Sequence, residues 1–282
     1  MRYNEEWKDY EVIATSNGEK LERWKDVYLL RPDPQVIWGG KDLKHNNLHA
    51  HYIRSNSGGG YWDIKKAIKD EWEISWRNLK FSIKLMGFKH TGVFPEQAYN
   101  WDRMIEKIKN ANREIKVLNL FAYTGGATLA CVSAGASVTH VDASKGMTQR
   151  AKENLKLSSL PEKARWIVDD CEKFITREIN RGNTYDAIIM DPPSYGRGPN
   201  GEVWKIEEKL YDFVKLCKKV LSDKPLFVLI NSYTTGLQPT VLKNISKLVF
   251  KDLFKEIDAY ELGIKTSEDI VLPCGASCFS SN

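Results

Sequence analysis

The stretch Lys116–Lys145 reads KVLNLFAYTGGATLACVSAGASVTHVDASK and is the most informative part of the chain about its fold class. Its apolar run Val117–Phe121 is too short for a helix and is typical of a buried strand. A turn with Gly125 and Gly126 follows, then a helix of small residues, and then a β-branched run that ends at Asp142. The order is therefore strand, glycine turn, helix, strand and carboxylate.

This order predicts a site for a nucleoside. Glycines in the turn allow positive φ and close approach of the backbone to a ligand, and the helix that starts there offers unpaired N–H groups. Asp142 lies near the spacing at which dinucleotide-binding units place a carboxylate on the ribose hydroxyls. The turn Phe121–Gly126 reads FAYTGG instead of G-x-G-x-x-G, which disfavours a pyrophosphate site. A glycine turn in an unrelated α/β protein remains the alternative for this stretch alone.

The composition indicates a globular chain of 282 residues, with 42% hydrophobic and 28% charged residues. Its net charge of +5 is compatible with RNA binding and with many other functions. The N-terminus lacks the apolar core of a signal peptide, and the apolar run 226–230 is too short to span a bilayer. The five cysteines contain no C-x-x-C pair. We expect a soluble, cytoplasmic protein without a membrane segment.

Two domains are predicted. Residues 1–96 hold six of the nine tryptophans and several short alternating runs, which favour a small antiparallel β subdomain. Strands are expected at 27–30 and 35–38, and a slip of the alternation at Arg77-Asn78 indicates a bulge or a tight turn. Residues 97–282 are expected to form the second domain.

Helices and strands alternate through this second domain. The expected helices are residues 101–108, 145–158, 171–181, 207–221 and 238–252, and the strands that follow Asp142 are residues 165–168, 185–190, 226–231, 258–264 and 270–279. The pattern predicts an α/β fold with a seven-stranded, doubly wound Rossmann-like sheet. In such sheets, ligands bind at the carboxyl ends of the strands.

Two further motifs follow strands of this sheet. Asp169-Asp170 closes the third strand, where a carboxylate can accept the amine of an adenine or can cap the next helix. Asp191-Pro192-Pro193-Ser194-Tyr195 closes the fourth strand. Its prolines fix their φ angles and remove two donors, so that local carbonyls can face a substrate N–H group. Asp191 can orient that group or take its proton, and a loop merely stiffened by prolines is the alternative.

The glycine turn, Asp142, Asp170 and the D-P-P-S-Y loop occur in the order found in class I S-adenosylmethionine-dependent methyltransferases, which this chain resembles. The resemblance implies S-adenosylmethionine as cofactor. It also implies a set of cofactor-binding residues on the three loops: Phe121, Tyr123, Thr124, Gly125, Asp142, Ala143, Ser144, Asp170 and Cys171. Asp191, Pro192 and Pro193 are implied to be catalytic.

A second resemblance covers residues 72–282. The segment Gly87–Gln97, GFKHTGVFPEQ, is similar to the G-x-K-T-G-x-x-x-D-Q hairpin of bacterial 23S ribosomal RNA methyltransferases of the large-subunit cytosine carbon-5 group. It implies that Gln97 approaches the cofactor and that the substrate is a base of ribosomal or other RNA.

The chain departs from that group in two respects. Residues 1–70 are too short and too differently patterned for its PUA domain, and Ile230–Thr234 lacks the cysteine that the group places after the fifth strand. Carbon-5 methylation of cytosine needs a thiolate at carbon-6. Cys274 is the one plausible substitute, and a structural thiol is the better interpretation. Asn231 resembles the Asn of a relative that acts on a guanine ring nitrogen, so a catalytic Asn231 and nitrogen methylation stay open.

The segment 196–205 is expected to be a mobile lid or substrate loop, and a plain surface loop is the alternative. Tyr195 and Arg197 are candidate substrate contacts, with Trp204 and Lys205 as further phosphate or base contacts. No metal site is predicted. Three other functions stay open: methylation of a protein or small molecule, nicotinamide-dependent oxidation, and RNA binding without catalysis.

Overall fold

The structure is a computed structural model that describes residues 1–55, 59–197 and 203–282. The described chain forms two compact units. The α/β unit contains Met1–Arg2, Tyr99–Leu262 and Gly275–Asn282, and the N-terminal unit contains Tyr3–Ala98 and Gly263–Cys274.

The α/β unit is built on a seven-stranded sheet. Its strands are β8 (Lys116–Leu120), β9 (Ser137–Asp142), β10 (Ala164–Val168), β11 (Ala187–Met190), β14 (Phe227–Ser232), β15 (Glu256–Lys265) and β16 (Val271–Ser281). They lie in the order β10-β9-β8-β11-β14-β16-β15. The pairs from β10 to β14 are parallel, and β16 runs antiparallel to β14. The expected seven-stranded, doubly wound sheet is confirmed.

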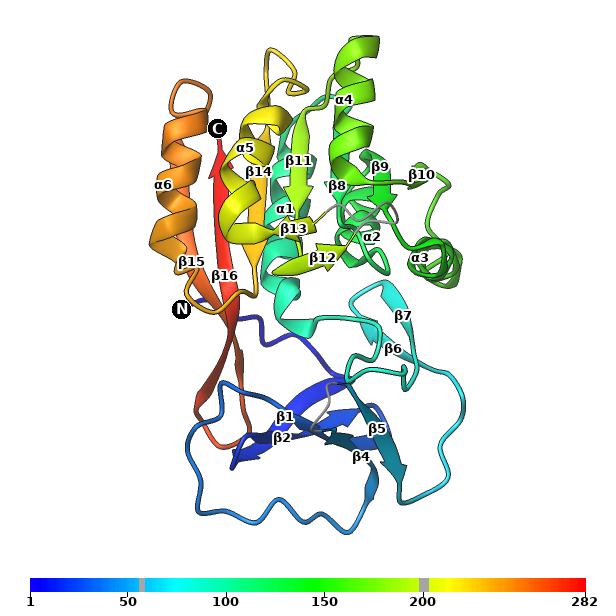
Figure 1. Cartoon of the computed structure of the whole chain (residues 1–282). Coiled ribbons are helices and arrows are strands. Elements are labelled where there is room, and N and C mark those ends of the chain that lie inside the picture. Colours follow the sequence, from blue (N-terminus) through cyan, green and yellow to red (C-terminus); the bar gives the residue numbers. More distant parts are fainter. Residues whose placement is uncertain (56–58, 198–202) are drawn as a thin grey trace. The chain divides into compact units, whose positions relative to one another are not determined.

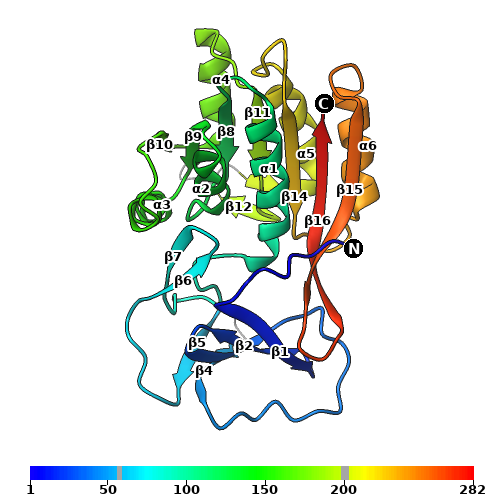
Figure 2. The same ribbon diagram turned by 180° about the vertical axis from the view of Figure 1, so that it is seen from behind.

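Helices cover both faces of this sheet. They are α1 (Ala98–Asn110), α2 (Gly126–Ser133), α3 (Lys145–Leu157), α4 (Cys171–Arg181), α5 (Ile206–Lys218) and α6 (Pro239–Phe250). The helices α4, α5 and α6 lie in front of the sheet in Figure 1, whereas α1 and α2 lie in front of it in the reverse view of Figure 2. The main core packs α4–α6 on the sheet and includes the fully buried Ile188, Val214 and Phe250. Burying each such side chain contributes roughly 1.5–3 kcal/mol.

Two helices begin where the sequence predicts because side chains cap them. The Ser144 hydroxyl accepts the N–H of Met147 at the start of α3, and the Asp170 carboxylate accepts the N–H of Lys173 at the start of α4. Gly182 ends α4 in the left-handed conformation, with φ of 68°. These caps fix the two loops that leave β9 and β10.

The N-terminal unit contains a five-stranded sheet and a hairpin. The sheet strands are β1 (Tyr10–Ser16), β2 (Glu19–Trp24), β3 (Val27–Pro32), β4 (Leu48–Arg54) and β5 (Gly60–Ile64); the hairpin strands are β6 (Trp72–Trp76) and β7 (Leu79–Ile83); and the 3-10 helix η1 (Pro95–Gln97) follows. The sheet is antiparallel except for the parallel pair β3–β4. The expected β-rich N-terminal region is confirmed.

Two local predictions in this unit had different outcomes. The phase slip at Arg77-Asn78 is a tight turn that closes the hairpin β6–β7, with Arg77 at φ of 51°. The strand expected at 35–38 is wrong. The carbonyls of Val36 and Trp38 accept N–H groups of Gly18 and Asn17 in the turn between β1 and β2, so this segment joins no sheet.

The C-terminal hairpin contributes residues to the N-terminal unit. Thr266 forms a bridge with Val12 of β1, and the N–H of Ser267 donates to the carbonyl of Val12. Glu268 pairs with Lys41 and also accepts the N–H of Thr15. Residues 263–274 are therefore attached to β1 by hydrogen bonds and to Lys41 by an ion pair.

Candidate functional site

The strand register aligns the predicted motifs at one edge of the seven-stranded sheet. Leu120 of β8 is paired with Val141 of β9 and with Met190 of β11. Met190 is also paired with Ile230 of β14. Because parallel strands end at the same edge, the residues that follow these pairs form one row: Asp142, Phe121, Asp191 and Asn231.

Asp142 has both carboxylate oxygens fixed by backbone groups. Oδ2 accepts the N–H of Tyr123 and Oδ1 accepts the N–H of Ser144, each at 2.8 Å. Burial raises the pKa of Asp142, and the two N–H groups oppose that shift. Each oxygen keeps a further lone pair. The carboxylate is therefore held in one orientation in which both oxygens can accept hydroxyl groups of a vicinal diol.

The turn between β8 and α2 carries backbone strain. Phe121, Tyr123 and Gly125 have φ of 55°, 50° and 86°. A left-handed conformation costs a residue with a side chain about 1–2 kcal/mol. Such strain collects at ligand sites, where the surrounding structure holds it in place.

Neighbouring elements hold this turn. Ala122 donates its N–H to the carbonyl of Val141 on β9, at 3.1 Å. The side-chain amide of Asn154 on α3 donates to the carbonyl of Thr124, at 3.0 Å. β9 and α3 thus hold this turn from two sides.

The two glycines of the turn are also required by packing. A Cβ atom on Gly125 would lie 2.9 Å from the Cβ of Ala151 on α3. A Cβ on Gly126 would lie 2.6 Å from the Trp101 ring on α1. The start of α2 therefore approaches α1 and α3 as closely as glycine allows.

The carboxylates after β10 already have protein partners. Asp169 pairs with Arg177 and donates its N–H to the carbonyl of Asp142. Asp170 is exposed and uses Oδ1 to cap α4, at 2.8 Å from the nitrogen of Lys173. Asp170 thus has the capping role that the sequence offered as an alternative. The second oxygen of this exposed carboxylate, Oδ2, is the one that an adenine amine would contact. An adenine contact stays a prediction.

The other predicted residues of these two loops differ in exposure. Ala143 is exposed, as is Ser144, the N-cap of α3. Cys171 is only 4% exposed, and burial raises the pKa of its thiol. The Cys171 thiol is therefore held protonated and fills space below the turn.

The loop after β11 is stiff and partly occupied. Pro192 is buried, whereas Pro193 is exposed. The carbonyl of Pro193 accepts the indole N–H of Trp204 at 2.7 Å, so this carbonyl does not stand ready for a substrate as the sequence predicts. The hydroxyls of Ser194 and Thr234 lie 2.6 Å apart. This contact joins the loop after β11 to the loop after β14.

The segment after the prolines is a short hairpin of β12 (Tyr195–Arg197) and β13 (Val203–Lys205). Residues 198–202, which the predicted substrate loop includes, lie outside the described residues. Tyr195 and Arg197 are exposed, and Arg197 Nε donates to the Tyr195 hydroxyl at 2.7 Å. Trp204 packs within the unit instead of presenting its N–H to a base.

Asn231 is 3% exposed and lies in a hydrogen-bonded network. Its Oδ1 accepts Asn100 Nδ2 at 3.1 Å and the Ser277 hydroxyl at 2.7 Å. Asn100 Oδ1 in turn accepts the hydroxyl of Tyr260 at 2.5 Å. Ser277 is directly opposite Asn231 in the β14–β16 pair, which puts both side chains on one face. The amide of Asn231 is therefore fixed in one orientation.

Sequence reasoning missed Asn100 and Asn154. Asn100 lies one residue before the predicted helix 101–108 and four residues before Met104, in line with its apolar face. A polar residue on such a face was the available signal, because a buried amide needs partners. Asn154 carried no comparable signal, since its partner is a backbone carbonyl of a distant turn.

Two other predicted residues belong to the N-terminal unit. Gln97 is 8% exposed and ends η1, and its role toward the cofactor stays a prediction. Cys274 Sγ contacts the carbonyl of Leu272 at 3.5 Å, and burial raises the pKa of this thiol. A protonated thiol favours a structural role. Across the described residues, no helix is long and apolar enough to cross a membrane.

Comparison with known proteins agrees with this geometry. A family model of S-adenosylmethionine-dependent methyltransferases matches residues 29–234. The crystal structure of the SAM-dependent methyltransferase from Agrobacterium tumefaciens has a TM-score of 0.91 and 34% sequence identity, and the match covers 99% of this chain and 92% of that one.

Curated relatives match over shorter regions. Ribosomal RNA large subunit methyltransferase K/L of Shewanella frigidimarina is 35% identical over 144 residues, 49% of this chain and 19% of that protein. Ribosomal RNA large subunit methyltransferase I of Photobacterium profundum is 33% identical over 124 residues, 43% of this chain and 30% of that protein. The chain spans less than a third of the length of either relative. The row of residues at the carboxyl edge of the sheet, the family match and the Agrobacterium structure agree. The chain therefore belongs to the S-adenosylmethionine-dependent methyltransferases.

Proposed function

We propose that this methyltransferase modifies a base of ribosomal RNA. The observation that carries the proposal is the row of Asp142, Phe121, Asp191 and Asn231 at one edge of the sheet. The names of the curated relatives supply the substrate class. An RNA target of this kind also favours a cytoplasmic location.

Asp142 and the strained turn are suited to hold the cofactor. The two fixed oxygens of Asp142 would accept the ribose hydroxyls. The turn from Phe121 to Gly125 would surround the amino-acid tail, and Asp170 Oδ2 would receive the adenine amine. When bound, S-adenosylmethionine supplies a methyl group already activated for transfer. The protein's contribution is then mainly alignment of the acceptor.

Asp191 is the residue that we assign to the methyl acceptor. It follows Met190 directly, between Phe121 and Asn231 in the row. Its carboxylate would accept an N–H of the target base, orient the nitrogen lone pair and take the proton that leaves. A base in folded RNA has to be unstacked or single-stranded to reach such a site.

A ring or exocyclic nitrogen is the acceptor that we favour. Carbon-5 of cytosine needs a thiolate partner. Cys278 is the cysteine paired with β14, opposite Ile230, and it is fully buried with a raised pKa because of burial. A buried protonated thiol within a strand supplies no nucleophile.

The proposal is tested by transfer of labelled methyl groups. Total RNA and total protein from cells that lack this gene are each incubated with the purified protein and methyl-labelled S-adenosylmethionine. We expect label in large-subunit ribosomal RNA, on a nucleoside with a nitrogen-linked methyl group. Label confined to protein would contradict the RNA assignment and leave the methyltransferase assignment intact.

A further inference from the structure

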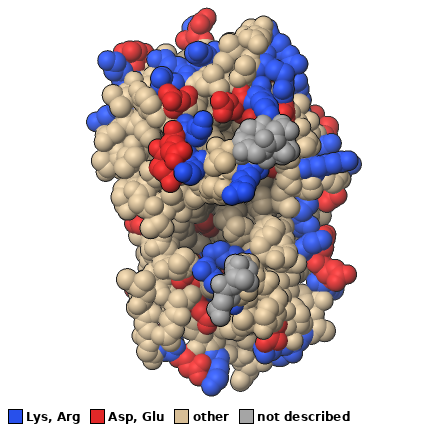
Figure 3. All heavy atoms as spheres, viewed as in Figure 1, with Lys and Arg blue, Asp and Glu red and all other residues tan. Residues whose placement is uncertain are grey.

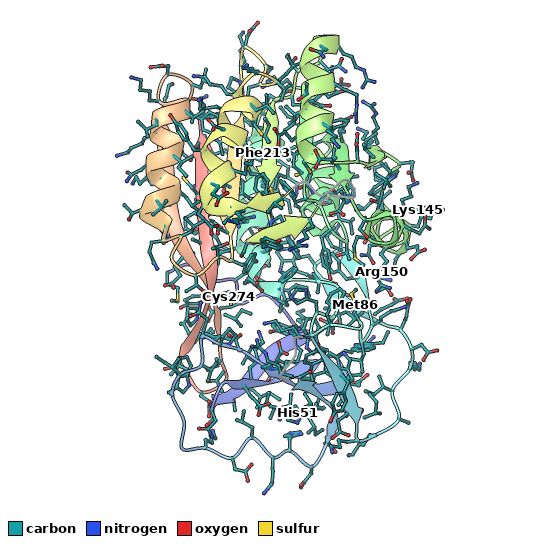
Figure 4. All side chains as sticks on the ribbon, in the orientation of Figure 1. His51, Met86, Lys145, Arg150, Phe213 and Cys274 are labelled. Atoms are coloured by element: carbon teal, nitrogen blue, oxygen red, sulfur yellow. The ribbon has the colours of Figure 1, made fainter. Side chains whose placement is uncertain are left out.

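Trp204 connects two loops that the proposed function uses separately. It lies on β13, the second strand of the hairpin that continues the D-P-P-S-Y loop. Its ring packs against Phe121 in the turn after β8, with 5.6 Å between centroids. It also meets Phe213 edge-on at 5.5 Å, and Phe213 lies on α5 (Figure 4).

The three rings form a closed cluster. Phe121 and Phe213 are themselves 5.5 Å apart, so each ring contacts the other two. Aromatic pairs at such distances contribute about 0.5–1.5 kcal/mol beyond the area they bury. Phe121 has φ of 55°, and this packing helps to hold it in that strained conformation.

The indole N–H of Trp204 fixes the other loop. It donates to the carbonyl of Pro193 at 2.7 Å. The backbone of Ile206 also donates to the carbonyl of Ser194, at 3.1 Å, so the loop is attached at two successive residues. The position of Pro193, and through it that of Asp191 two residues earlier, therefore depends on where the indole lies.

We propose that Trp204 is a positioning residue that couples the cofactor turn to the substrate loop. The inference rests on the proposed function, in which the Phe121 turn holds the amino-acid tail and Asp191 faces the base. Occupation of the turn orders Phe121, Phe121 orders the indole, and the indole N–H sets the Pro193 carbonyl. The loop is thereby held more firmly for the methyl acceptor when the cofactor turn is filled.

Hydrogen exchange with S-adenosylhomocysteine tests this coupling without a methyl acceptor. The exchange rates of the backbone N–H groups in residues 194–197 and 203–206 are compared with and without S-adenosylhomocysteine. We expect the ligand to slow exchange in the wild-type protein. W204F keeps an aromatic ring but lacks the indole N–H that donates to Pro193. We expect the protection by the ligand to fall about 2- to 10-fold in W204F, because one net hydrogen bond changes an equilibrium by about that factor.

Two further variants make the test specific. W204A removes the ring as well and should abolish the protection. W62F is the matched control, since Trp62 also donates its indole N–H to a backbone carbonyl, that of Met86, at 2.8 Å in the N-terminal unit. W62F should retain the wild-type protection. Melting temperatures of all variants verify that each is folded.

The outcomes separate this inference from the proposed function. If S-adenosylhomocysteine binds but the hairpin shows no protection, or if W204F and W204A keep full protection, the coupling by Trp204 is refuted and the cofactor site stands. An equal loss of protection in W62F also refutes it. If S-adenosylhomocysteine does not raise the melting temperature of the wild-type protein, the assigned cofactor site itself fails, and the coupling fails with it.

Discussion

Both the shape of the turn after β8 and the packing of the α/β unit require a glycine at position 125. Its φ of 86° and its 2.9 Å approach to Ala151 are separate demands, and glycine alone meets both. The need for a glycine in this turn was predictable from the sequence pattern. The approach of α3 to the turn was not predictable, because nothing in the local pattern encodes that distance.

G125A should therefore destabilise the protein for two reasons, strain and overlap. Strain at positive φ costs about 1–2 kcal/mol, and overpacking adds roughly 1–3 kcal/mol. Urea unfolding measures the loss. The matched control is G182A, since Gly182 has φ of 68° but no atom within 4 Å of an added Cβ. An equal loss of stability in G125A and G182A would contradict a contribution from the close approach to Ala151.

His140 makes the stability of the α/β unit depend on pH. It is fully buried on β9, and its Nδ1 lies 2.9 Å from the hydroxyl of Thr128. Burial lowers the pKa of His140 to about 3 from an ordinary 6.5. Between these values the unfolded chain binds a proton that the folded protein does not. The contribution of neutral His140 to the free energy of unfolding is therefore complete above about pH 6.5, and it declines as the pH falls toward 3.

H140N should remove this dependence, because Asn has no titratable group. The free energy of unfolding of the wild-type protein should fall about 1.4 kcal/mol more per pH unit than that of H140N between pH 4 and 6. Burial, with help from Arg31, Lys89 and Lys20, lowers the pKa of His90 to about 4, and this acts equally in both proteins. Denaturant titrations at several pH values give the comparison. Parallel curves would refute the assignment.

Two aspartates flank the strand β11 and serve different purposes. Asp186 precedes the strand at its amino end and Asp191 follows it at the carboxyl end. Asp186 accepts the N–H of Lys116 and the hydroxyl of Ser222, and it pairs with Arg113 at 2.8 Å. Burial opposes these bonds, but the pKa of Asp186 is lowered overall. It is a structural carboxylate.

D191N and D186N should separate reaction from stability. D191N should retain cofactor affinity and lower methyl transfer about 100- to 10,000-fold, the usual contribution of a general base. D186N should retain transfer per folded molecule and lose about 1–3 kcal/mol of stability, because it weakens buried hydrogen bonds. Thermal unfolding and single-turnover methyl transfer give both quantities for each variant. Full activity of D191N would remove Asp191 from the mechanism.

Elements were predictable where a local signal marks them. Ser144 and Asp170 are capping residues, and the helices that they start were placed correctly at 145 and 171. The strand expected at 35–38 was wrong because its backbone groups bond to a turn rather than to a strand. The hairpin β12–β13 went unrecognised because its strands have three residues each and flank a glycine-rich segment.

At the scale of the whole molecule, long-range pairing is what the sequence does not reveal. Val12 and Thr266 are joined in one unit although most of the chain lies between them. Neither segment carries a sequence pattern that identifies the segment with which it pairs. The charge distribution adds little, since Lys and Arg side chains are scattered among Asp and Glu over the face in Figure 3. The substrate assignment therefore rests on the relatives and on the site.

The row of strand ends is a different kind of long-range feature, and it was predictable. The alternation of strands and helices imposes a doubly wound sheet, and that topology brings the ends of β8, β9, β11 and β14 to one edge. The hydrogen-bond partners within the row, such as Asn100 for Asn231, depend on packing and were not predictable.

Calorimetric titration of S-adenosylmethionine into the wild-type protein and into D142N measures whether the Asp142 carboxylate holds the cofactor. We predict one site in the wild-type protein, no binding of NAD, and affinity in D142N weaker by about 10- to 100-fold, since hydrogen bonds to a charged group contribute about 1.5–3 kcal/mol. D186N, as the matched Asp-to-Asn control, should bind like the wild-type protein. Equal affinity of D142N and the wild-type protein would contradict the assignment of this sheet edge as the cofactor site.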